Sequence, residues 1–287
     1  MVPRRTSASI VLVMLVGALS LAAALRARAD ETVTIGMIPD AGATQVAIDQ
    51  KGPLRDYLSG AIGKPVKLII PTNYNATIEG MGNGSLDVAY FGALSYVKAH
   101  DRYAVVPLVQ RDIDRQFHSL FITQADSGIK SLADLKGKRF AFGDINSTSG
   151  HLMPYLAMKK AGIDVDKDLQ SSRYTGSHPA TAEAVASGAA DAGALDETVF
   201  KSMIDGGKLD KAKVVVFYTT PPFVDYVWAA RKDLDAKVQK KIVEAFARLE
   251  RGRDDKVLEI LRGEHFVPVE DGAYQEIRST ASALGLL

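Results

Sequence analysis

Three consecutive hydroxyl residues, Ser147, Thr148 and Ser149, have the types and spacing expected of an anion site. They stand between a predicted apolar strand (139–142) and a predicted helix (152–161). The first amides of a helix lack intrahelical acceptors, and the helix dipole adds positive potential there. Hydroxyls beside those amides predict a cradle for a tetrahedral oxyanion that needs no lysine. Serine and threonine also favour ordinary helix N-caps, but three adjacent hydroxyls exceed what capping needs.

Four further side chains are candidates because they stand where predicted strands and helices meet. Tyr74 lies between a strand and a helix, where its hydroxyl could point at a ligand or merely cap the strand edge. Phe91 ends a short apolar strand and either lines the cleft or belongs to the core. His178 opens a helix, as a charge-assisted donor to an anion or as an exposed cap. His118, just before another strand, is a further candidate for the cleft.

Carboxylates also follow predicted strands. Asp196 and Glu197 come directly after an apolar strand, and Asp225 lies in a run of mainly apolar and aromatic residues. Such groups would accept a hydrogen bond from a protonated oxyanion or bind an amine of the ligand. Carboxylates in loops are commonly only solvated, so both readings stay open.

The N-terminal residues 1–29 are predicted to be a secretory signal peptide, cleaved after Ala29. Arg4 and Arg5 precede an uncharged run over 10–25, and a small-x-small cleavage site follows. A transmembrane anchor is the alternative, but the run is shorter than the roughly 20 residues a span requires. The chain has no cysteine, which excludes a lipid-modified N-terminal cysteine and disulfides. We therefore expect export into a bacterial periplasm, by either the general secretory or the twin-arginine route.

Charge and motif content exclude several classes of function. Cleavage would remove 4 of the 35 lysines and arginines, leaving 31 against 34 acidic residues, a formal charge of −3. A slightly acidic surface argues against nucleic-acid binding. No Walker loop, dinucleotide glycine motif or His-Glu-x-x-His helix is present. With no cysteine and five scattered histidines, neither a metal site nor a cofactor is expected.

Strands and helices alternate along the 258 residues that follow position 29 (287 − 29). This length exceeds one compact core and predicts two lobes. Repeated strand–helix–strand units predict parallel sheets with helices on both faces, an α/β class, with the ligand in a crevice at the carboxyl ends of the strands. The expected elements include strands at 32–38, 65–70, 88–91, 105–109, 120–123, 171–174, 190–194 and 214–218, and helices at about 44–62, 75–82, 179–187, 235–251 and 272–284.

Six short motifs occur in one order and together carry a family resemblance. From Thr32 to Val267 the chain resembles the phosphonate/phosphite/phosphate-binding proteins of ABC importers, often called PhnD-like. The motifs are Asn73-Tyr-Asn75 with Ile78-Glu-Gly-Met81, Asp87-Val-Ala-Tyr-Phe-Gly-Ala-Leu-Ser95, Ser127-Gly-Ile-Lys-Ser-Leu-Ala-Asp-Leu-Lys-Gly-Lys138, Ser147-Thr-Ser-Gly-His-Leu-Met-Pro154, Gly176-Ser-His178, and Pro221-Pro222 ahead of Arg231-Lys-Asp-Leu234.

The resemblance implies a type II periplasmic binding protein fold, with two α/β lobes joined by a hinge that the chain crosses twice. Lobe 1 is expected to comprise 30–122 plus 226–287, and lobe 2 to comprise 123–225. The crossings are expected near 120–123 and 226–230, with closure of the lobes burying the ligand. The implied partners are a small oxyanion and the permease–ATPase complex of the inner membrane, and we expect a monomer.

The resemblance also implies roles for the candidate residues. Tyr74, His178 and the hydroxyls at 147–149 match positions that hold the ligand oxygens in the family. The carboxylates that receive an aminoalkyl end correspond less cleanly to residues 196–197 and to Asp225. No residue is assigned a catalytic role.

One position departs from the family pattern. Some relatives carry a second ligand-binding tyrosine where this chain has Phe117, so one donor is lost unless His118 replaces it. A site built around particular hydrogen bonds rejects ligands that leave a partner unpaired. Phosphite, phosphate, an alkylphosphonate and a selenate-type ion therefore remain open, and we expect a compact anion in preference to a long aminoalkylphosphonate.

Two alternatives change the function. The same fold could present its anion to a membrane sensor kinase instead of a permease. A serine hydrolase would use Ser147 or Ser149 with His151 or His178 and Asp196, but the chain has no Gly-x-Ser-x-Gly elbow. We therefore expect a binding protein and not an enzyme.

Overall fold

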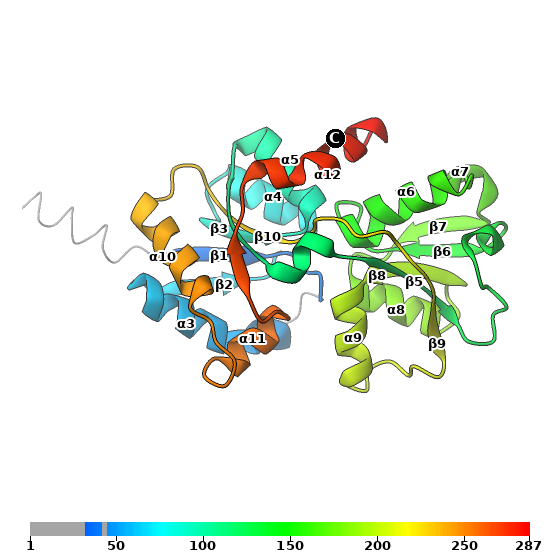
Figure 1. Cartoon of the computed structure of the whole chain (residues 1–287), viewed down its shortest axis with the longest axis horizontal. Helices are drawn as coiled ribbons and strands as arrows, with labels where there is room; N and C mark the ends of the chain where they lie inside the picture. Colours follow the sequence, from blue (N-terminus) through cyan, green and yellow to red (C-terminus); the bar gives the residue numbers. More distant parts are fainter. Residues whose placement is uncertain (1–31, 42–44) are drawn as a thin grey trace, which may run out of the picture.

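The computed structural model describes residues 32–41 and 45–287, which form two α/β lobes, each built on its own sheet (Figure 1). The predicted signal peptide, 1–29, lies outside the described residues. Within the described ranges, we find no helix with the length and apolar character to cross a membrane. The predicted fold class, two α/β lobes with a hinge of two crossings, is confirmed.

The sheet of the first lobe has the strand order β11-β4-β10-β3-β1-β2 in the described part of the chain. Its strands are β1 (Val33–Met37), β2 (Val66–Ile69), β3 (Val88–Phe91), β4 (Val106–Arg111), β10 (Val227–Ala230) and β11 (Phe266–Pro268). Its helices are α2 (Gln45–Asp49), α3 (Gly52–Ile62), α4 (Tyr74–Gly82), α5 (Ala93–Tyr103), α10 (Ala236–Ala247), α11 (Asp255–Leu261), η4 (Asp271–Tyr274) and α12 (Gln275–Ala283).

The sheet of the second lobe has the order β7-β6-β8-β5-β9. Its strands are β5 (Ser119–Gln124), β6 (Arg139–Phe142), β7 (Ser171–Tyr174), β8 (Ala192–Asp196) and β9 (Val214–Thr219). Its helices are η2 (Leu132–Leu135), the π-helical turn η3 (Thr148–Leu152), α6 (Met153–Lys160), α7 (Val165–Asp168), α8 (His178–Ala186) and α9 (Glu197–Asp205).

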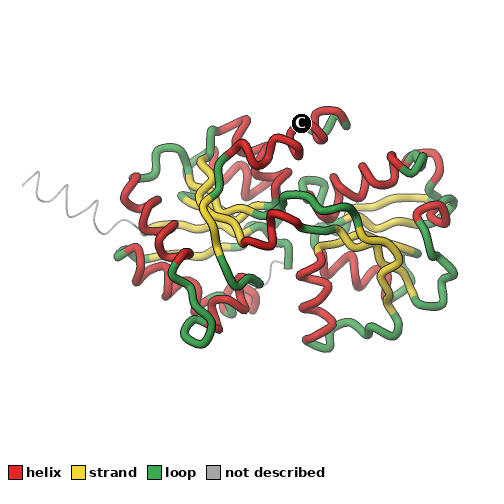
Figure 2. Tube along the Cα trace, viewed as in Figure 1, coloured by secondary structure: helices red, strands yellow, loops and turns green. Residues whose placement is uncertain are grey.

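Both sheets lie between helices (Figure 2), which explains their apolar central strands. In the first lobe β1 runs parallel to β2 and β3, whereas β10 runs antiparallel to β3 and β4. All four residues of β3 are buried, as expected for a strand covered on both faces. The ends of β4 and β9 and the starts of β5 and β10 adjoin the segments that connect the two lobes.

The region predicted as one helix over 44–62 contains two helices, α2 and α3. Pro53 lies in the first turn of α3, where a proline is tolerated because its missing N–H would have no intrahelical acceptor. The helix α3 ends at Gly63, which has φ 73° in the left-handed region. Proline thus ends one helical run and starts the next.

Two antiparallel segments, 112–118 and 220–226, join the lobes (Figure 1). The first contains the short helix η1 (Asp112–Gln116). Phe117 and Phe223 exchange backbone hydrogen bonds of 2.8 and 2.9 Å, which tie the segments together. The sequence placed the crossings slightly later, at 120–123 and 226–230. Those residues lie mainly in β5 and β10. These strands belong to the sheets and not to the hinge, because β5 pairs with β8 and β9, and β10 pairs with β3 and β4.

A buried ion pair stabilises the hinge. Arg111 and Asp114 are both about 1% exposed, and the guanidinium donates to the carboxylate from Nε (2.9 Å) and Nη2 (2.6 Å). The same guanidinium lies 5.0 Å from the ring centre of Tyr226 and 5.6 Å from that of Phe117. Arg111 therefore connects both hinge segments, and the second segment delivers Asp225 and Tyr226 to the space between the lobes.

Candidate functional site

The hydroxyl cradle is a π-helical turn that follows β6. Ser147 is the N-cap of η3, and its side chain accepts a hydrogen bond from the Gly150 amide (3.0 Å). A Cβ atom at Gly150 would lie 3.1 Å from Cα of Gly143 and 3.0 Å from Cε1 of His178. Only glycine lets the turn approach so closely, and π-helical turns are frequent at functional sites.

The three hydroxyls of the cradle have different partners. The Ser147 hydroxyl is occupied as the cap. The Thr148 hydroxyl accepts a hydrogen bond from the Leu94 amide of the first lobe (3.0 Å). The Ser149 hydroxyl is fully buried and has no hydrogen-bond partner among the described residues. Capping therefore accounts for only one of the three.

Tyr74 reaches the same space from the first lobe. It is the first residue of α4, after the N-cap Asn73, and its side chain is 1% exposed. Its hydroxyl has no partner in the described part of the chain. Burial raises the pKa of Tyr74 well above its ordinary value, and the carboxylates of Asp40 and Asp144 raise it further. The hydroxyl therefore remains protonated and able to donate.

Asp225 faces Tyr74 and the cradle from the second hinge segment. Its Oδ1 accepts a hydrogen bond from the Ala93 amide at the start of α5 (2.9 Å), while Oδ2 finds no partner within the described ranges. A Cβ atom at Gly92 would lie 3.3 Å from both Asp225 Oδ1 and Thr148 Oγ1, so these two side chains share one small space. Burial raises the pKa of Asp225 to about 7, although hydrogen bonds from the Ala93 amide and the Thr148 hydroxyl counteract it.

Asp196 is the second carboxylate of the site. Its Oδ1 caps α9, accepting from the amides of Thr198 (2.5 Å) and Val199 (2.8 Å). Its Oδ2 is buried and unpartnered in the described structure. Burial raises the pKa of Asp196, but the positive charges of Arg262 and other groups outweigh it, and the net pKa is lowered. Asp196 is therefore ionised and presents one free oxygen.

Its neighbour Glu197 lies outside this chamber. One carboxylate oxygen of Glu197 accepts from the His118 amide (2.9 Å), and burial raises its pKa. Of the two adjacent carboxylates, only Asp196 has a free oxygen enclosed between the lobes.

His178 is fully buried at the start of α8, as a neutral imidazole. Its Nδ1 accepts from the Asp196 amide (3.3 Å), which assigns the proton to Nε2, and Nε2 lies 3.3 Å from the Tyr226 hydroxyl. Burial lowers the pKa of His178, and the charges of Asp196 and Asp40 only partly oppose it. Of the two forms that the sequence allowed for this donor, the structure favours the neutral tautomer over the imidazolium.

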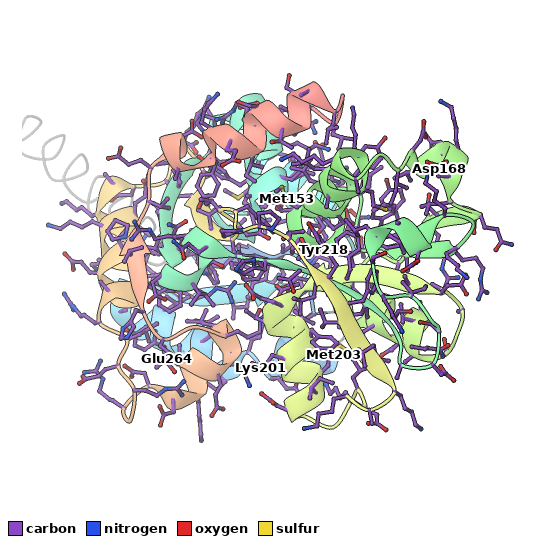
Figure 3. All side chains as sticks on the ribbon, turned by 45° about the vertical axis from the view of Figure 1, so that its right-hand side comes forward. Met153, Asp168, Lys201, Met203, Tyr218 and Glu264 are labelled. Atoms are coloured by element: carbon purple, nitrogen blue, oxygen red, sulfur yellow. The ribbon has the colours of Figure 1, made fainter. Side chains whose placement is uncertain are left out.

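Phe91 is fully buried in the apolar cluster of the first lobe, which also includes Tyr74 and Tyr226, so its place at the ligand stays a prediction. His118 lies elsewhere. His118 contacts the Thr220 carbonyl through Nδ1 (2.7 Å), and its ring lines a groove of about 1420 Å³ between η1, α9 and α11. Lys201, labelled in Figure 3, lines the same groove from α9. His118 points there because successive side chains along a strand alternate between its two faces.

Several residues of the site escaped the sequence reasoning. Tyr226 is fully buried, and the only signal for it was its place beside Asp225. Asp40, which is buried, forms an ion pair with the partly exposed Arg262. Asp144 accepts hydrogen bonds from the amides of Asn146 and Tyr74, which counteract the rise that burial causes in its pKa. Nothing in the sequence pattern pointed to these pairings, because the partners come from distant segments.

Direct hydrogen bonds join the two lobes around the site. The His178 amide donates to the Asp40 carbonyl (3.1 Å), and Lys98 Nζ donates to Asn146 Oδ1 (2.8 Å). Together with the bond from the Leu94 amide to Thr148, they hold the lobes in a closed arrangement. The cradle, Tyr74 and the two aspartates are all 2% exposed or less, so these polar side chains are shielded from solvent.

The ring nitrogens of His178 and His151 have partners within the protein. Both ring nitrogens of His178 are engaged by Asp196 and Tyr226. Those of His151 contact the Ile145 carbonyl (2.8 Å) and the Tyr174 hydroxyl (2.9 Å). No group of three or more histidine or acidic side chains that could hold a metal ion occurs among the residues described.

Two lobes closed over a cluster of buried polar side chains, several of them without partners, are typical of a solute-binding protein. Residues 35–274 match the family model described as "ABC transporter, phosphonate, periplasmic substrate-binding protein". The chain therefore belongs to this family of periplasmic substrate-binding proteins of ABC transporters.

Individual proteins of this kind are also similar to the chain in sequence and in structure. The chain is 32% identical over 270 residues to a probable ABC transporter phosphite-binding protein of Prochlorococcus marinus, covering 88% of this chain and 90% of the relative. It is 29% identical to a phosphate-import protein of Mycolicibacterium smegmatis, covering 76% of this chain and 72% of the relative. The crystal structure of the Prochlorococcus marinus protein PhnD1 with methylphosphonate superposes with a TM-score of 0.84 at 30% identity, covering 89% of this chain and 99% of that one.

Proposed function

We propose that this protein binds a compact tetrahedral oxyanion of the phosphate, phosphite or phosphonate class between its lobes and delivers it to an ABC permease and its ATPase. The observation that carries the proposal is a set of buried polar atoms without partners in the described structure: Tyr74 Oη, Ser149 Oγ, Asp196 Oδ2 and Asp225 Oδ2. A buried polar group left unpaired costs about 1–3 kcal/mol. A ligand that pairs with all four recovers this cost on binding.

The set contains donors and acceptors, which restricts the ligand. The hydroxyls of Tyr74 and Ser149 donate to anionic oxygens, and the remaining hydroxyls and amides of the cradle surround the same anion. The free oxygen of Asp196 belongs to an ionised group and must accept a hydrogen bond. Hydrogen phosphate, hydrogen phosphite and hydrogen methylphosphonate each carry a P–OH donor. Sulfate and selenate carry none at neutral pH, so the selenate-type alternative is disfavoured.

Asp225 is suited to share a proton with the ligand. With a pKa of about 7, its carboxyl group is half protonated near neutral pH. It can therefore accept from the P–OH of a monoanion or donate to an oxygen of the dianion. This arrangement lets one site bind both protonation states of phosphate or phosphite, whose own second ionisation lies in the same region.

His178 contributes a neutral donor. Its Nε2–H donates to the Tyr226 hydroxyl, and we propose that the Tyr226 O–H in turn donates to the ligand's remaining oxygen. The Asp196 amide bond to Nδ1 fixes the ring orientation that this role requires.

Enclosure favours a small ligand. The side chains assigned to the ligand are 2% exposed or less, so a bound ligand would be enclosed, and we propose a compact ligand such as methylphosphonate in preference to a long aminoalkylphosphonate. An ammonium would require an ionised carboxylate beside it. The raised pKa of Asp225 weakens that residue as the partner, which leaves Asp196, whose pKa is lowered, as the one that an ammonium could pair with. We further propose that the chain works as a monomer in the periplasm after removal of residues 1–29.

Calorimetric titration of the chain from residue 30 to 287 tests the proposal. We expect binding of phosphite, phosphate or methylphosphonate, weaker binding of 2-aminoethylphosphonate, and no binding of sulfate or selenate. Binding of sulfate or selenate with equal affinity would refute the protonated-ligand argument. Absence of binding to every phosphorus oxyanion in the panel would refute the proposal as a whole.

A further inference from the structure

Ser119 carries a buried hydroxyl at the end of β5 that adjoins the hinge. It is the first residue of β5, directly after the hinge segment, and its side chain is fully buried. Its amide donates to Thr220 Oγ1 (3.0 Å) and its carbonyl accepts from the Thr220 amide (3.1 Å). The Ser119 hydroxyl itself has no partner in the described part of the chain.

Strand register fixes the side of the sheet to which Ser119 points. Along β5, Ser119 pairs with Asp196 and Phe121 pairs with Ala194 of β8. Phe121 and Ala194 belong to an apolar cluster that includes Met158 of α6. Because side chains alternate between the faces of a sheet, Ser119 and Asp196 share the face that α6 covers.

The turn η3 lies on that same face. It leads directly into α6, and it packs against both β8 and β5. The opposite face carries Ile122 and Leu195, which pack in a second cluster with Val185 of α8. The Ser119 hydroxyl therefore lies on the side of the sheet where the cradle is built.

We propose that Ser119 is a further ligand-contacting residue, whose hydroxyl donates to an oxygen of the bound oxyanion. Directly opposite residues in an antiparallel pair have Cβ atoms about 4.5–5.5 Å apart, so the Ser119 hydroxyl and Asp196 Oδ2 form an adjacent donor and acceptor. A P–OH group beside an anionic oxygen matches such a pair. This inference rests on the proposed function and names one of its specificity-determining residues.

The assignment accounts for the missing hydroxyl at Phe117. The Phe117 ring packs within the hinge, 5.4 Å from the ring of Tyr226 and 6.2 Å from that of Phe223. His118, the next candidate, lines the outer groove. Ser119 is the first hydroxyl after the hinge, and it points to the cradle side of β5. The donor lost at residue 117 is thus supplied two residues later, at the first residue of β5.

Another buried hydroxyl of β5 provides a matched control. The Thr123 hydroxyl donates to the Asp191 carbonyl (2.7 Å) and can accept from the Ser127 hydroxyl (2.9 Å), so its partners lie within the protein. Removing the Ser119 hydroxyl should leave the unliganded protein as stable as before, because it breaks no hydrogen bond. Removing the Thr123 hydroxyl should lower the melting temperature instead.

The experiment compares wild type, Ser119→Ala and Thr123→Val by calorimetric titration with phosphite, phosphate and methylphosphonate, and by thermal melting with and without each anion. For Ser119→Ala we expect an unchanged melting temperature without ligand and a roughly ten- to hundredfold loss of affinity. For Thr123→Val we expect a lower melting temperature and unchanged affinity.

Wild-type affinity retained in Ser119→Ala would overturn the assignment while leaving the proposed function intact. A lowered melting temperature of unliganded Ser119→Ala, with unchanged affinity, would make the hydroxyl structural. If His118→Gln loses affinity and Ser119→Ala does not, His118 is the donor. If wild type binds none of the three anions, the proposed function fails first, and the role of Ser119 falls with it.

Discussion

Replacing Asp225 by asparagine should remove a pH-dependent loss of stability from the unliganded protein. The substitution keeps the shape of the side chain and an oxygen that can accept from the Ala93 amide. It removes a carboxyl group whose pKa rises from 3.8 to about 7 on burial. That rise corresponds to about 4 kcal/mol, at about 1.36 kcal/mol for each pKa unit.

The sign follows from where the proton is bound. Between the two pKa values, the folded protein keeps the Asp225 proton and the unfolded chain has lost it. The contribution of Asp225 to stability is therefore fully present below pH 3.8 and is lost as the pH rises through about 7. Asparagine has no such dependence. The stability advantage of Asp225→Asn over wild type should widen by about 2.5 kcal/mol between pH 5 and pH 8.

Thermal unfolding of both unliganded proteins across this pH range measures the effect. For a chain of this size, about 2.5 kcal/mol corresponds to a change of roughly 5–10 °C in the difference between the two melting temperatures. Comparing the proteins at each pH cancels the titration of all other groups. A difference that stays constant from pH 5 to pH 8 would show that Asp225 has an ordinary pKa, and the proton-sharing role would be refuted.

Three further substitutions test the site. Thr148→Ala should lower oxyanion affinity roughly tenfold or more, since it removes a hydroxyl of the cradle and the acceptor of the Leu94 amide; unchanged affinity in titrations would exclude Thr148 from the site. His178→Ala should lose affinity, and His178→Gln, which keeps an N–H donor, should retain more of it. Because burial lowers the pKa of His178, the affinity of wild type and of His178→Gln should change in the same way as the pH rises past 6.5. A fall in affinity seen only in wild type would show that His178 binds the ligand as an imidazolium. Lys98→Met should speed ligand release several-fold in stopped-flow measurements, because Lys98 bonds to Asn146 across the lobes; an unchanged release rate would show that this contact does not hold the closed state.

The sequence predicted those features that depend on local pattern. Alternating strands and helices indicated the α/β lobes, and the order of strand, three hydroxyls and helix located the cradle at Ser147–Ser149. The different hydrogen-bond partners of the three cradle hydroxyls could not be predicted from the sequence. Thr148 bonds to Leu94, which is 54 residues earlier in the sequence. Only the tertiary arrangement reveals which hydroxyl is left free for a ligand.

The site residues that were not predicted depend on strand register and on the geometry of the hinge. Ser119 and His118 are adjacent in the sequence, which gives no reason to prefer one over the other. Because side chains of an extended chain alternate, Ser119 points to the cradle side of the sheet and His118 to the groove between η1, α9 and α11. Tyr226 was not predicted as a site residue, because an aromatic residue near a strand usually belongs to the core. Its position against His178 arises from the second hinge segment, which turns around the buried Arg111–Asp114 pair.

A crystal structure of the chain with bound phosphite or methylphosphonate tests the central claim most directly. We predict the phosphorus atom between η3 and Tyr74, with ligand oxygens at about 2.7–3.2 Å from Ser149 Oγ and Tyr74 Oη. One oxygen should lie at hydrogen-bond distance from Asp225 Oδ2. A ligand bound instead in the groove between η1, α9 and α11, with the hydroxyls of Ser149 and Tyr74 still unpaired, would contradict the claim.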